Sequence, residues 1–321
     1  MNTVPESYIR VMPEPLYRFV RSAFIKAGMT EADATLMAEA LVAGDLRGVF
    51  SHGTWQVGSY VPALMAGKLN PRPNPTVVQE SATSVKVDGD GGLGYFPSFK
   101  AIRMAVQKAG NSGMAVGMTS NHGHFGSAGH YTRVAVDAGC FGLAVSSHYR
   151  EFKPDQSILG ASGASPISMG VPAGDQPALI IDMASGGERA QELFSEIPGT
   201  YFKMLGFGLI ANALGGILAG MVTQEESGPK TWEGVNQGAF FIVVDIAQLT
   251  DVTTFRRQMD AFIGDLRQMQ PPPGFDYAET PGGLEYERSL AWRKEGIPVG
   301  EQHQNTLKKV SEKLDIPLPW D

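Results

Sequence analysis

The chain has 321 residues but only one cysteine, Cys140, so it can form no intramolecular disulfide and no thiolate cage for a metal ion. Such sparse use of cysteine suits a reducing compartment, and we expect the protein in the cytoplasm. Basic residues are also few, with 26 Lys plus Arg against 33 Asp plus Glu and a formal charge of -7. Because no basic surplus is present to neutralise phosphates, nucleic acid is not an expected partner.

Long apolar runs are lacking as well. The most apolar stretch, residues 205–221, contains five glycines and falls short of the roughly 20 apolar residues that a bilayer requires. Residues 1–10 carry Glu6 and no apolar core, unlike a secretory signal. We therefore expect no membrane partner and interpret 205–221 as a buried, glycine-rich helix.

The residues that are present predict a folded α/β protein, since 43% of them are hydrophobic and 18% charged. Thr30 and Asp33 resemble a capping box and predict a helix over 31–46. Pro71, Pro73 and Pro75 exclude helix and indicate a domain boundary. Beyond it, short β-branched runs alternate with helical ones, as in α/β domains. We predict a helical first part at 1–75, an α/β domain at 76–248 and a helical return with the C-terminal segment at 249–321.

The segment Gly89–Gly94 matches the G-x-G-x-x-G spacing and lies between a predicted strand and a predicted helix. Asp88 and Asp90 place carboxylates where a pyrophosphate would lie, and no acidic residue closes a second strand about twenty residues later. The favoured interpretation is a structural turn that contacts no phosphate.

Two other segments contain side chains that could take part in catalysis or ligand binding. Residues 45–53 place Arg47, Ser51 and His52 in a glycine-flanked loop, where an imidazole can act as an acid near neutral pH and a guanidinium can hold an anion. Either this loop is catalytic or its histidine is structural. Residues 120–126 add His122 and His124 at the end of a predicted strand, where ligands gather in α/β sheets. No carboxylate lies nearby and the next imidazole falls in a helix, so we expect no metal.

Taken in order, several short motifs resemble one family, that of malate, L-lactate and L-sulfolactate dehydrogenases, which also holds ureidoglycolate dehydrogenase, diketogulonate reductase and Δ1-piperideine-2-carboxylate reductase. The Ser-His-Gly box is the most specific of them, and the likeness covers almost the whole chain. The motifs are D-x-R-G-x-x-S-H-G at 45–53, Tyr60 with 67–70, the turn at 87–89, N-H-x-x-F-G at 121–126, I-D-M-A at 181–184, Y-F-K at 201–203, and Pro281-Gly282.

The resemblance implies an α/β but non-Rossmann fold, in which a sheet domain binds NAD or NADP and the two ends of the chain form a helical domain. It implies that His52 donates a proton to a small oxo or imino compound, with Ser51 and Arg47 in support and Asp182 nearby. It also implies a homodimer. The cofactor would be held by these residues: His122, Ile181, Met183, Ala184, Ser185, Lys203, Pro281 and Gly282.

The chain also departs from the family pattern. Gln56 stands where an arginine suited to a substrate carboxylate is usual, and Ser165 replaces the asparagine of a G-T-N-P box. The segment before Tyr201 is shorter than in the family, so a loop near the cofactor is missing. We therefore expect poor activity on malate and lactate and weak or lost cofactor binding. The alternative hypothesis is a diverged member that uses His52 and Asp182 for lyase or isomerase chemistry.

Overall fold

The computed structural model describes residues 3–148, 151–184, 190–220 and 231–321. Contacts along the chain divide it into two compact units. The helical unit consists of Met1–Pro73 and Gly282–Asp321, and the sheet unit consists of Asn74–Pro281.

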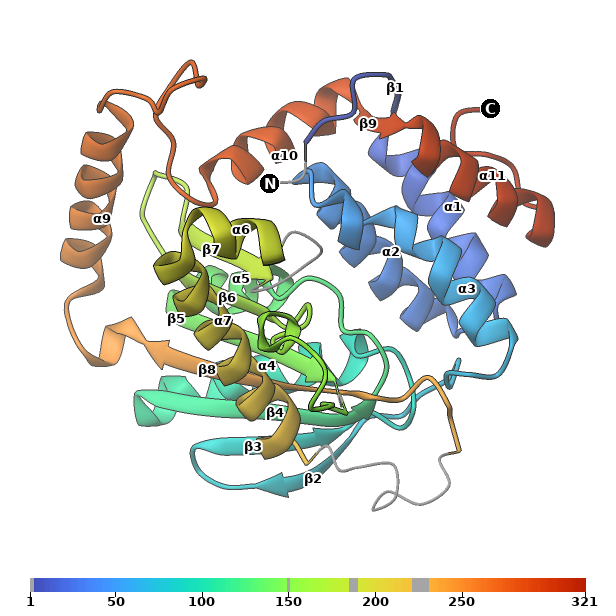
Figure 1. The fold of residues 1–321 in the computed structure, drawn as a ribbon, viewed down its shortest axis with the longest axis horizontal. Coiled ribbons are helices and arrows are strands. Elements are labelled where there is room, and N and C mark those ends of the chain that lie inside the picture. The colour runs from blue at the N-terminus through green and yellow to red at the C-terminus, as the bar shows by residue number, and fades with distance from the viewer. Residues whose placement is uncertain (1–2, 149–150, 185–189, 221–230) are drawn as a thin grey trace. The chain divides into compact units, whose positions relative to one another are not determined.

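The helical unit is built from both ends of the chain (Figure 1). The predicted helix over 31–46 is confirmed as α2, and the Thr30 hydroxyl accepts a hydrogen bond from the Asp33 amide at its start. Strands β1 and β9 pair antiparallel, with Tyr8 opposite Gly300, a pairing that the sequence pattern did not predict. Its elements are β1 (Tyr8–Val11), α1 (Pro13–Lys26), α2 (Glu31–Leu46), η1 (Phe50–His52), η2 (Thr54–Gln56), α3 (Val57–Met65), α10 (Gly283–Glu295), β9 (Ile297–Gly300) and α11 (Glu301–Leu314).

The sheet unit contains a seven-stranded sheet in the order β2-β3-β4-β8-β5-β6-β7. Only β3 and β4 run parallel; every other neighbouring pair is antiparallel. A Rossmann sheet is mostly parallel, so this mixed sheet agrees with the expectation of an α/β, non-Rossmann fold. Its elements are β2 (Thr76–Glu80), β3 (Ser84–Asp88), α4 (Tyr95–Ser112), β4 (Met114–His122), α5 (Gly129–Asp137), β5 (Cys140–His148), η3 (Ile158–Gly160), β6 (Pro166–Val171), β7 (Leu179–Ala184), α6 (Ala190–Glu196), α7 (Pro198–Asn212), the π-helical segment η4 (Ala213–Leu218), β8 (Gln237–Asp245), η5 (Ile246–Gln248) and α9 (Val252–Arg267).

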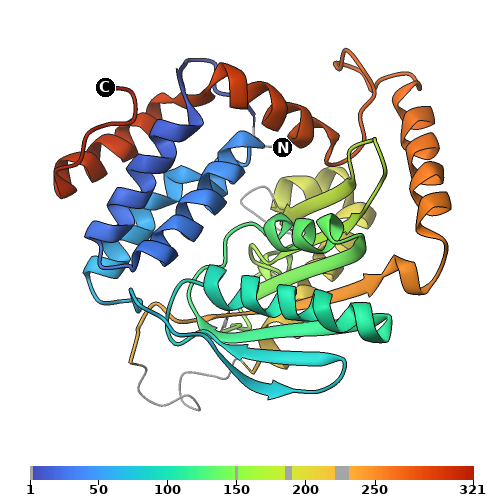
Figure 2. The same ribbon diagram turned by 180° about the vertical axis from the view of Figure 1, so that it is seen from behind.

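Alternation along the strands covers both faces of this sheet with apolar side chains. On β8, Phe241 and Val243 join the core beneath α4 and α5, whereas Phe240 faces the opposite core with Ala211 of α7. Figure 2 shows α4 lying along the strands on the first face. The sheet is therefore a buried middle layer between helices.

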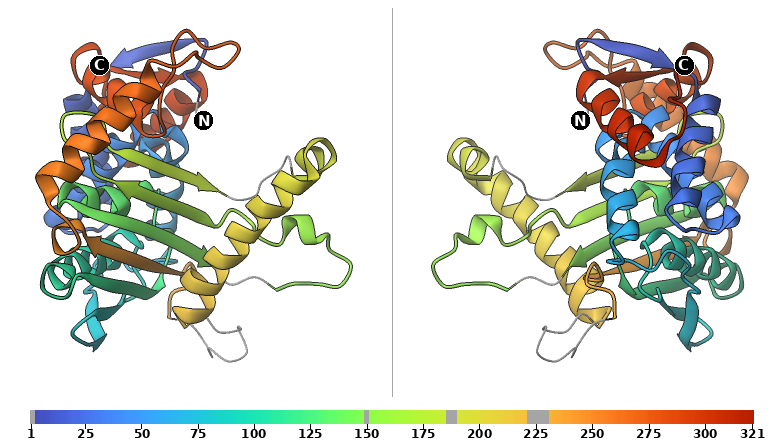
Figure 3. Two further views of the ribbon diagram at one scale, coloured as in Figure 1. Left: turned by 90° about the vertical axis from the view of Figure 1, so that its left-hand side faces the viewer. Right: turned by 90° about the vertical axis from the view of Figure 1, so that its right-hand side faces the viewer.

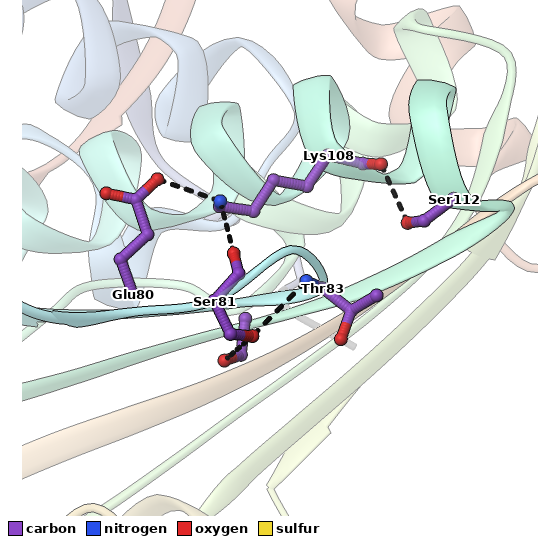
Figure 4. A network of polar contacts seen from close by, with 6 residues as sticks. Glu80, Ser81, Thr83, Lys108 and Ser112 are labelled. Carbon is purple, nitrogen blue, oxygen red and sulfur yellow. Dashed lines mark hydrogen bonds and ion pairs between the residues drawn. The ribbon is translucent and has the colours of Figure 1, made fainter.

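The hairpin between β2 and β3 is fixed to α4 by a lysine (Figure 4). The Lys108 ammonium lies 2.8 Å from a Glu80 carboxylate oxygen and donates to the Ser81 carbonyl oxygen at 2.6 Å. The Ser81 hydroxyl in turn accepts from the Thr83 amide. These contacts hold the edge of the sheet against its covering helix.

Helix α9 belongs to the sheet unit, although we expected the helical return to begin at residue 249. The Asp260 carboxylate accepts hydrogen bonds from three successive backbone amides at 174–176, and Arg267 bonds Glu279 at 2.6 Å. These hydrogen bonds join α9 to the sheet unit. The sheet unit therefore ends at Pro281, whereas we expected the α/β domain to end at residue 248.

We expected residues 205–221 to form a buried, glycine-rich helix, but α7 and the π segment η4 are only partly buried. The Cβ of any other residue at Gly215 would lie 2.8 Å from the Ser146 Cα, so this glycine lets η4 approach β5 closely. Farther from that contact, large apolar side chains of α7 are exposed to solvent: Phe202 is 56% exposed and Ile210 is 54% exposed. Figure 3 shows α7 lying obliquely to the strands. In length and composition alone, Pro198–Leu218 could also cross a membrane, which is weak evidence for a membrane span.

Candidate active site

The site residues expected from the sequence fall on both units, and each group is described within its own unit. In the helical unit, the chain leaves α2 at Arg47 and makes two short 3-10 turns before α3 begins. The first turn presents a hydroxyl next to an imidazole, because the Ser51 Oγ lies 2.9 Å from the His52 Nδ1. Ser51 is exposed and His52 is half-buried. This pair is accessible to a small molecule.

Two neighbours hold this loop in place. The Gln56 side-chain amide donates to the Ser51 carbonyl oxygen at 2.6 Å, so it supports the loop that carries His52. The Arg47 guanidinium donates to the Ala43 carbonyl oxygen in the last turn of α2, where a cation is favoured. Gln56 therefore stabilises the loop directly, whereas Arg47 stabilises the end of α2 at which the loop begins.

Beneath the loop lies a buried polar chain that the sequence pattern did not reveal. The Thr54 hydroxyl lies 2.6 Å from the Asp45 Oδ2 and 2.9 Å from the His303 Nε2, while the Thr54 amide donates to the same Asp45 oxygen. Any side chain at Gly53 would collide with Asp45, since a Cβ there would lie 1.7 Å from Oδ1. The glycine of the Ser-His-Gly box thus makes room for a carboxyl group.

Burial sets the charge state of this chain. Asp45 is fully buried, and desolvation raises its carboxyl pKa to about 7 although the Thr54 hydrogen bonds oppose the shift. Burial lowers the imidazole pKa of His303 to about 4. His303 is therefore neutral at neutral pH, and Asp45 is only partly ionised.

The helical unit also contains a cavity of about 430 Å³ that reaches this loop. Ser51 and Phe50 line it from the first 3-10 turn, and Trp55 lines it from the second. The start of α11 contributes Glu301, Gln302 and His303. The Trp55 indole stacks on the His303 ring, with 6.3 Å between centroids. Ser51 thus lies next to an imidazole and also lines a cavity that is aromatic at Phe50 and Trp55.

In the sheet unit, Asp182 of β7 accepts hydrogen bonds at one oxygen from the Ser127 hydroxyl, at 2.5 Å, and from the Gly129 amide, at 2.9 Å. Gly129 is the first residue of α5, so the carboxylate lies at the positive end of a helix. Sequence reasoning missed Ser127, since no pattern links it to a strand 55 residues later. The geometry fixes Asp182 in an exposed position at the edge of the sheet.

The residues expected around a cofactor are only partly brought together. Strand β7 holds Ile181, Met183 and Ala184 and lies at the sheet's edge, where the Ile180 amide donates to the Pro281 carbonyl oxygen at 2.9 Å. The I-D-M-A and Pro281 motifs therefore meet. Lys203 is exposed on α7, Gly282 is the N-cap of α10 in the helical unit, and Ser185 lies outside the described residues.

His122 occupies a different environment from the one expected of a cleft residue. It is fully buried, its Nδ1 lies 2.7 Å from the Gly123 carbonyl oxygen, and its Nε2 lies 2.8 Å from the Thr119 hydroxyl. Burial lowers its pKa to about 4. Since both ring nitrogens are used, His122 in this conformation supports the end of β4 and offers no nitrogen to a ligand.

The glycine-rich turn at Gly89–Gly94 is closed by its own contacts. The Asp88 carboxylate accepts from the Asp90 amide and from the Asn121 side chain, and the Asp90 carboxylate accepts from the Asn74 amide. These carboxylates occupy donors that a phosphate would need. Among the described residues no cluster of three or more His, Cys, Asp or Glu side chains could hold a metal ion.

Comparison with known proteins assigns the chain to a class of enzymes, the dehydrogenases. The family model described as malate/L-lactate dehydrogenase matches residues 11–187 and 187–308, and the chain belongs to this family. It is accordingly an enzyme of the malate/lactate dehydrogenase type. The match is split at residue 187, between β7 and α6, upstream of the segment before Tyr201 that we expect to be shortened.

Individual relatives agree. Malate dehydrogenase of Pyrococcus horikoshii is 26% identical over 353 aligned positions, covering 98% of each chain, and its solved structure superimposes with a TM-score of 0.84 over 99% of each chain. L-sulfolactate dehydrogenase of Methanocaldococcus jannaschii is 27% identical, covering 95% of this chain and 97% of the relative. The NAD(+)-linked ureidoglycolate dehydrogenase of Escherichia coli is 22% identical over 91% of this chain and 93% of its own. These relatives support oxidoreductase activity and a small-molecule substrate.

Proposed function

We propose that this protein is an NAD(P)-dependent oxidoreductase that transfers a hydride to or from a small oxo, hydroxy or imino compound, with His52 as the proton donor. The observation that carries the proposal is the Ser51–His52 pair, an accessible imidazole whose Nδ1 lies 2.9 Å from a hydroxyl. Membership in a dehydrogenase family favours this activity over the lyase or isomerase alternative.

In this mechanism the residues of the chain donate the proton and stabilise the negative charge that develops on the substrate oxygen. Ser51 contacts Nδ1 and orients the ring, and we assign proton transfer to the His52 imidazole. The imidazolium stabilises the oxyanion that develops on a carbonyl as hydride arrives, and then gives it a proton. Gln56 holds the loop through the Ser51 carbonyl oxygen and Arg47 fixes the end of α2 before it, so we assign both to positioning His52. Asp182 belongs to the sheet unit, and we assign it to the same reaction because the family resemblance implies that role.

A nicotinamide dinucleotide, when bound, supplies or accepts the hydride. The sheet unit fits such a ligand at β7, which is an edge strand with Asp182 and Ala184 exposed, and the exposed Lys203 offers a cation for a phosphate. We propose that the backbone of 181–185, Lys203 and Pro281-Gly282 hold the dinucleotide. His122 would act there only indirectly, through the end of β4.

We also propose a homodimer. Apolar side chains on α7 and η4 are exposed in the single chain, among them Phe202, Ile210 and Ile217, the last at 77%. Large exposed apolar patches commonly mark subunit interfaces.

Our proposal of a cytoplasmic location rests on the composition and on Cys140, a free, buried thiol.

The direct test is titration of NADH and NADPH into the purified protein, followed by nicotinamide fluorescence, and then an assay of both cofactors with a panel of small 2-oxo and imino acids. We expect saturable binding of at least one cofactor and its substrate-dependent oxidation. If neither cofactor binds at millimolar concentration and none is oxidised, the protein is not an NAD(P)-dependent oxidoreductase.

A further inference from the structure

The cavity beside Ser51 has a charge pattern that bears on the substrate. Among the described residues that line it there is no lysine or arginine, and one carboxylate, Glu301, stands at the start of α11. The imidazole on its wall, His303, is held by the Thr54 hydroxyl and is buried, so it supplies no positive charge at neutral pH. An anionic group in this cavity would meet a like charge and no counter-ion.

The cavity's apolar lining is well suited to an uncharged group. Phe50 and Trp55 present aromatic surface, and the indole is 40% exposed although it stacks on His303. Burying aromatic or aliphatic surface here is favourable at about 25 cal/mol per Å². A cavity of about 430 Å³ lies within the usual range for small-molecule sites, roughly 300–1,000 Å³.

Gln56 does not restore the missing charge. Its amide donates to the Ser51 carbonyl oxygen at 2.6 Å, and it is a neutral group. A carboxylate or sulfonate that leaves water without gaining a cationic partner loses hydration free energy that nothing in this cavity returns. A substrate with a second anionic group therefore has no site for it within the helical unit's cavity.

We propose that this cavity receives the part of the substrate that lies away from the reacting carbon, and that it selects an uncharged apolar group over a carboxylate or sulfonate. Ser51 connects the two functions, since it lines the cavity and contacts the imidazole of His52. This inference rests on the proposed function. It makes the protein an oxidoreductase for compounds with an aromatic or aliphatic tail, and it disfavours malate and sulfolactate.

The test compares two probes with the same 2-hydroxy-acid head, 3-phenyllactate and malate, which differ in the tail alone. Binding to the full chain is followed by the Trp55 indole N–H resonance, assigned with a Trp55→Phe variant, and needs no cofactor. We expect phenyllactate to shift this resonance and to bind at least tenfold more tightly than malate. Equal affinities, or a phenyllactate titration that leaves the Trp55 signal unmoved, would overturn the proposal.

Reversing the charge at the cavity sharpens the comparison. Glu301→Lys should raise the affinity for malate about tenfold and leave that for phenyllactate nearly unchanged. Glu312→Lys is the matched control, because it makes the same change on an exposed position of the same helix, away from the cavity, and should alter neither affinity. If Glu301→Lys leaves the ratio of the two affinities unchanged, the cavity does not bind the tail.

Failure of this inference is distinguishable from failure of the proposed function. Phenyllactate binding at Trp55, in a protein that neither binds NADH or NADPH nor oxidises them with any compound of the panel, supports the cavity assignment and contradicts the oxidoreductase. Oxidation of malate at least as efficient as that of phenyllactate supports the oxidoreductase and contradicts the cavity assignment.

Discussion

His52 and His122 each precede a glycine in segments that look alike in the sequence, yet the structure gives them opposite environments. His52 is half-buried, and its Nδ1 contacts a neighbouring hydroxyl. His122 is fully buried, and both of its nitrogens are occupied by Thr119 and Gly123. A buried, doubly bonded imidazole resists protonation, whereas an accessible one can exchange protons with a substrate. Burial and hydrogen bonding, more than the motif, separate an acid from a structural support.

The largest expected effect on stability comes from His122. His122→Ala removes a buried ring and leaves the Thr119 hydroxyl and the Gly123 carbonyl without their partner, so we expect a loss of roughly 3 kcal/mol in the free energy of unfolding. Urea denaturation measures it, with kcat corrected for the folded fraction as the second readout. Unchanged stability together with a large loss of kcat would show that His122 acts on the substrate.

A smaller loss is expected where the polar chain beneath the His52 loop is interrupted. Thr54→Val keeps the shape but deprives Asp45 and His303 of the shared hydroxyl, which should cost roughly 1–3 kcal/mol. Thr54→Ser retains the hydroxyl and serves as the control. If urea denaturation gives the valine and serine variants the same stability, the hydroxyl contributes nothing to this unit.

The pH dependence of stability sharpens the comparison further. His122 and His303 have pKa values near 4 in the fold, below the usual 6.5, so their contribution is present above pH 6.5 and is lost as the pH falls towards 4. Asp45, with a pKa near 7, acts oppositely, since its contribution is present below pH 3.8 and is lost as the pH rises through 7.

Asp45→Asn removes the opposing contribution. The variant should therefore lose stability more steeply than the wild type between pH 6.5 and 4, by about 1.4 kcal/mol per pH unit. Urea unfolding at three pH values in this range gives both slopes. Parallel slopes would mean that Asp45 is ionised in the fold throughout this range.

The smallest effect, close to zero, is expected at the glycine-rich turn. Asp90→Asn removes a negative charge from a carboxylate that caps the Asn74 amide, and the turn contacts no phosphate in our account. Dinucleotide affinity should stay the same within error. A marked tightening in the fluorescence titration would return the phosphate-binding interpretation to Gly89–Gly94.

Local features of the fold could be predicted from the sequence, and features that join distant segments could not. The cap at Thr30 and the periodicity after it predict α2, and alternating runs predict strands such as β5, because these signals lie within one turn or one strand. Nothing local indicates that β8 lies between β4 and β5, or that Asp260 binds the turn at 174–176. The Thr54–His303 contact spans 249 residues and was missed for the same reason.

The central claim is that His52 is the acid of a nicotinamide-linked reaction. The most direct measurement is the rate of NADH or NADPH oxidation with the best substrate of the panel, in the wild type and in His52→Gln, with thermal unfolding of both as a check on the fold. We predict substrate-dependent oxidation by the wild type and a loss of at least about 100-fold in the variant at unchanged thermal stability. A variant that retains the wild-type rate would contradict the assignment of His52.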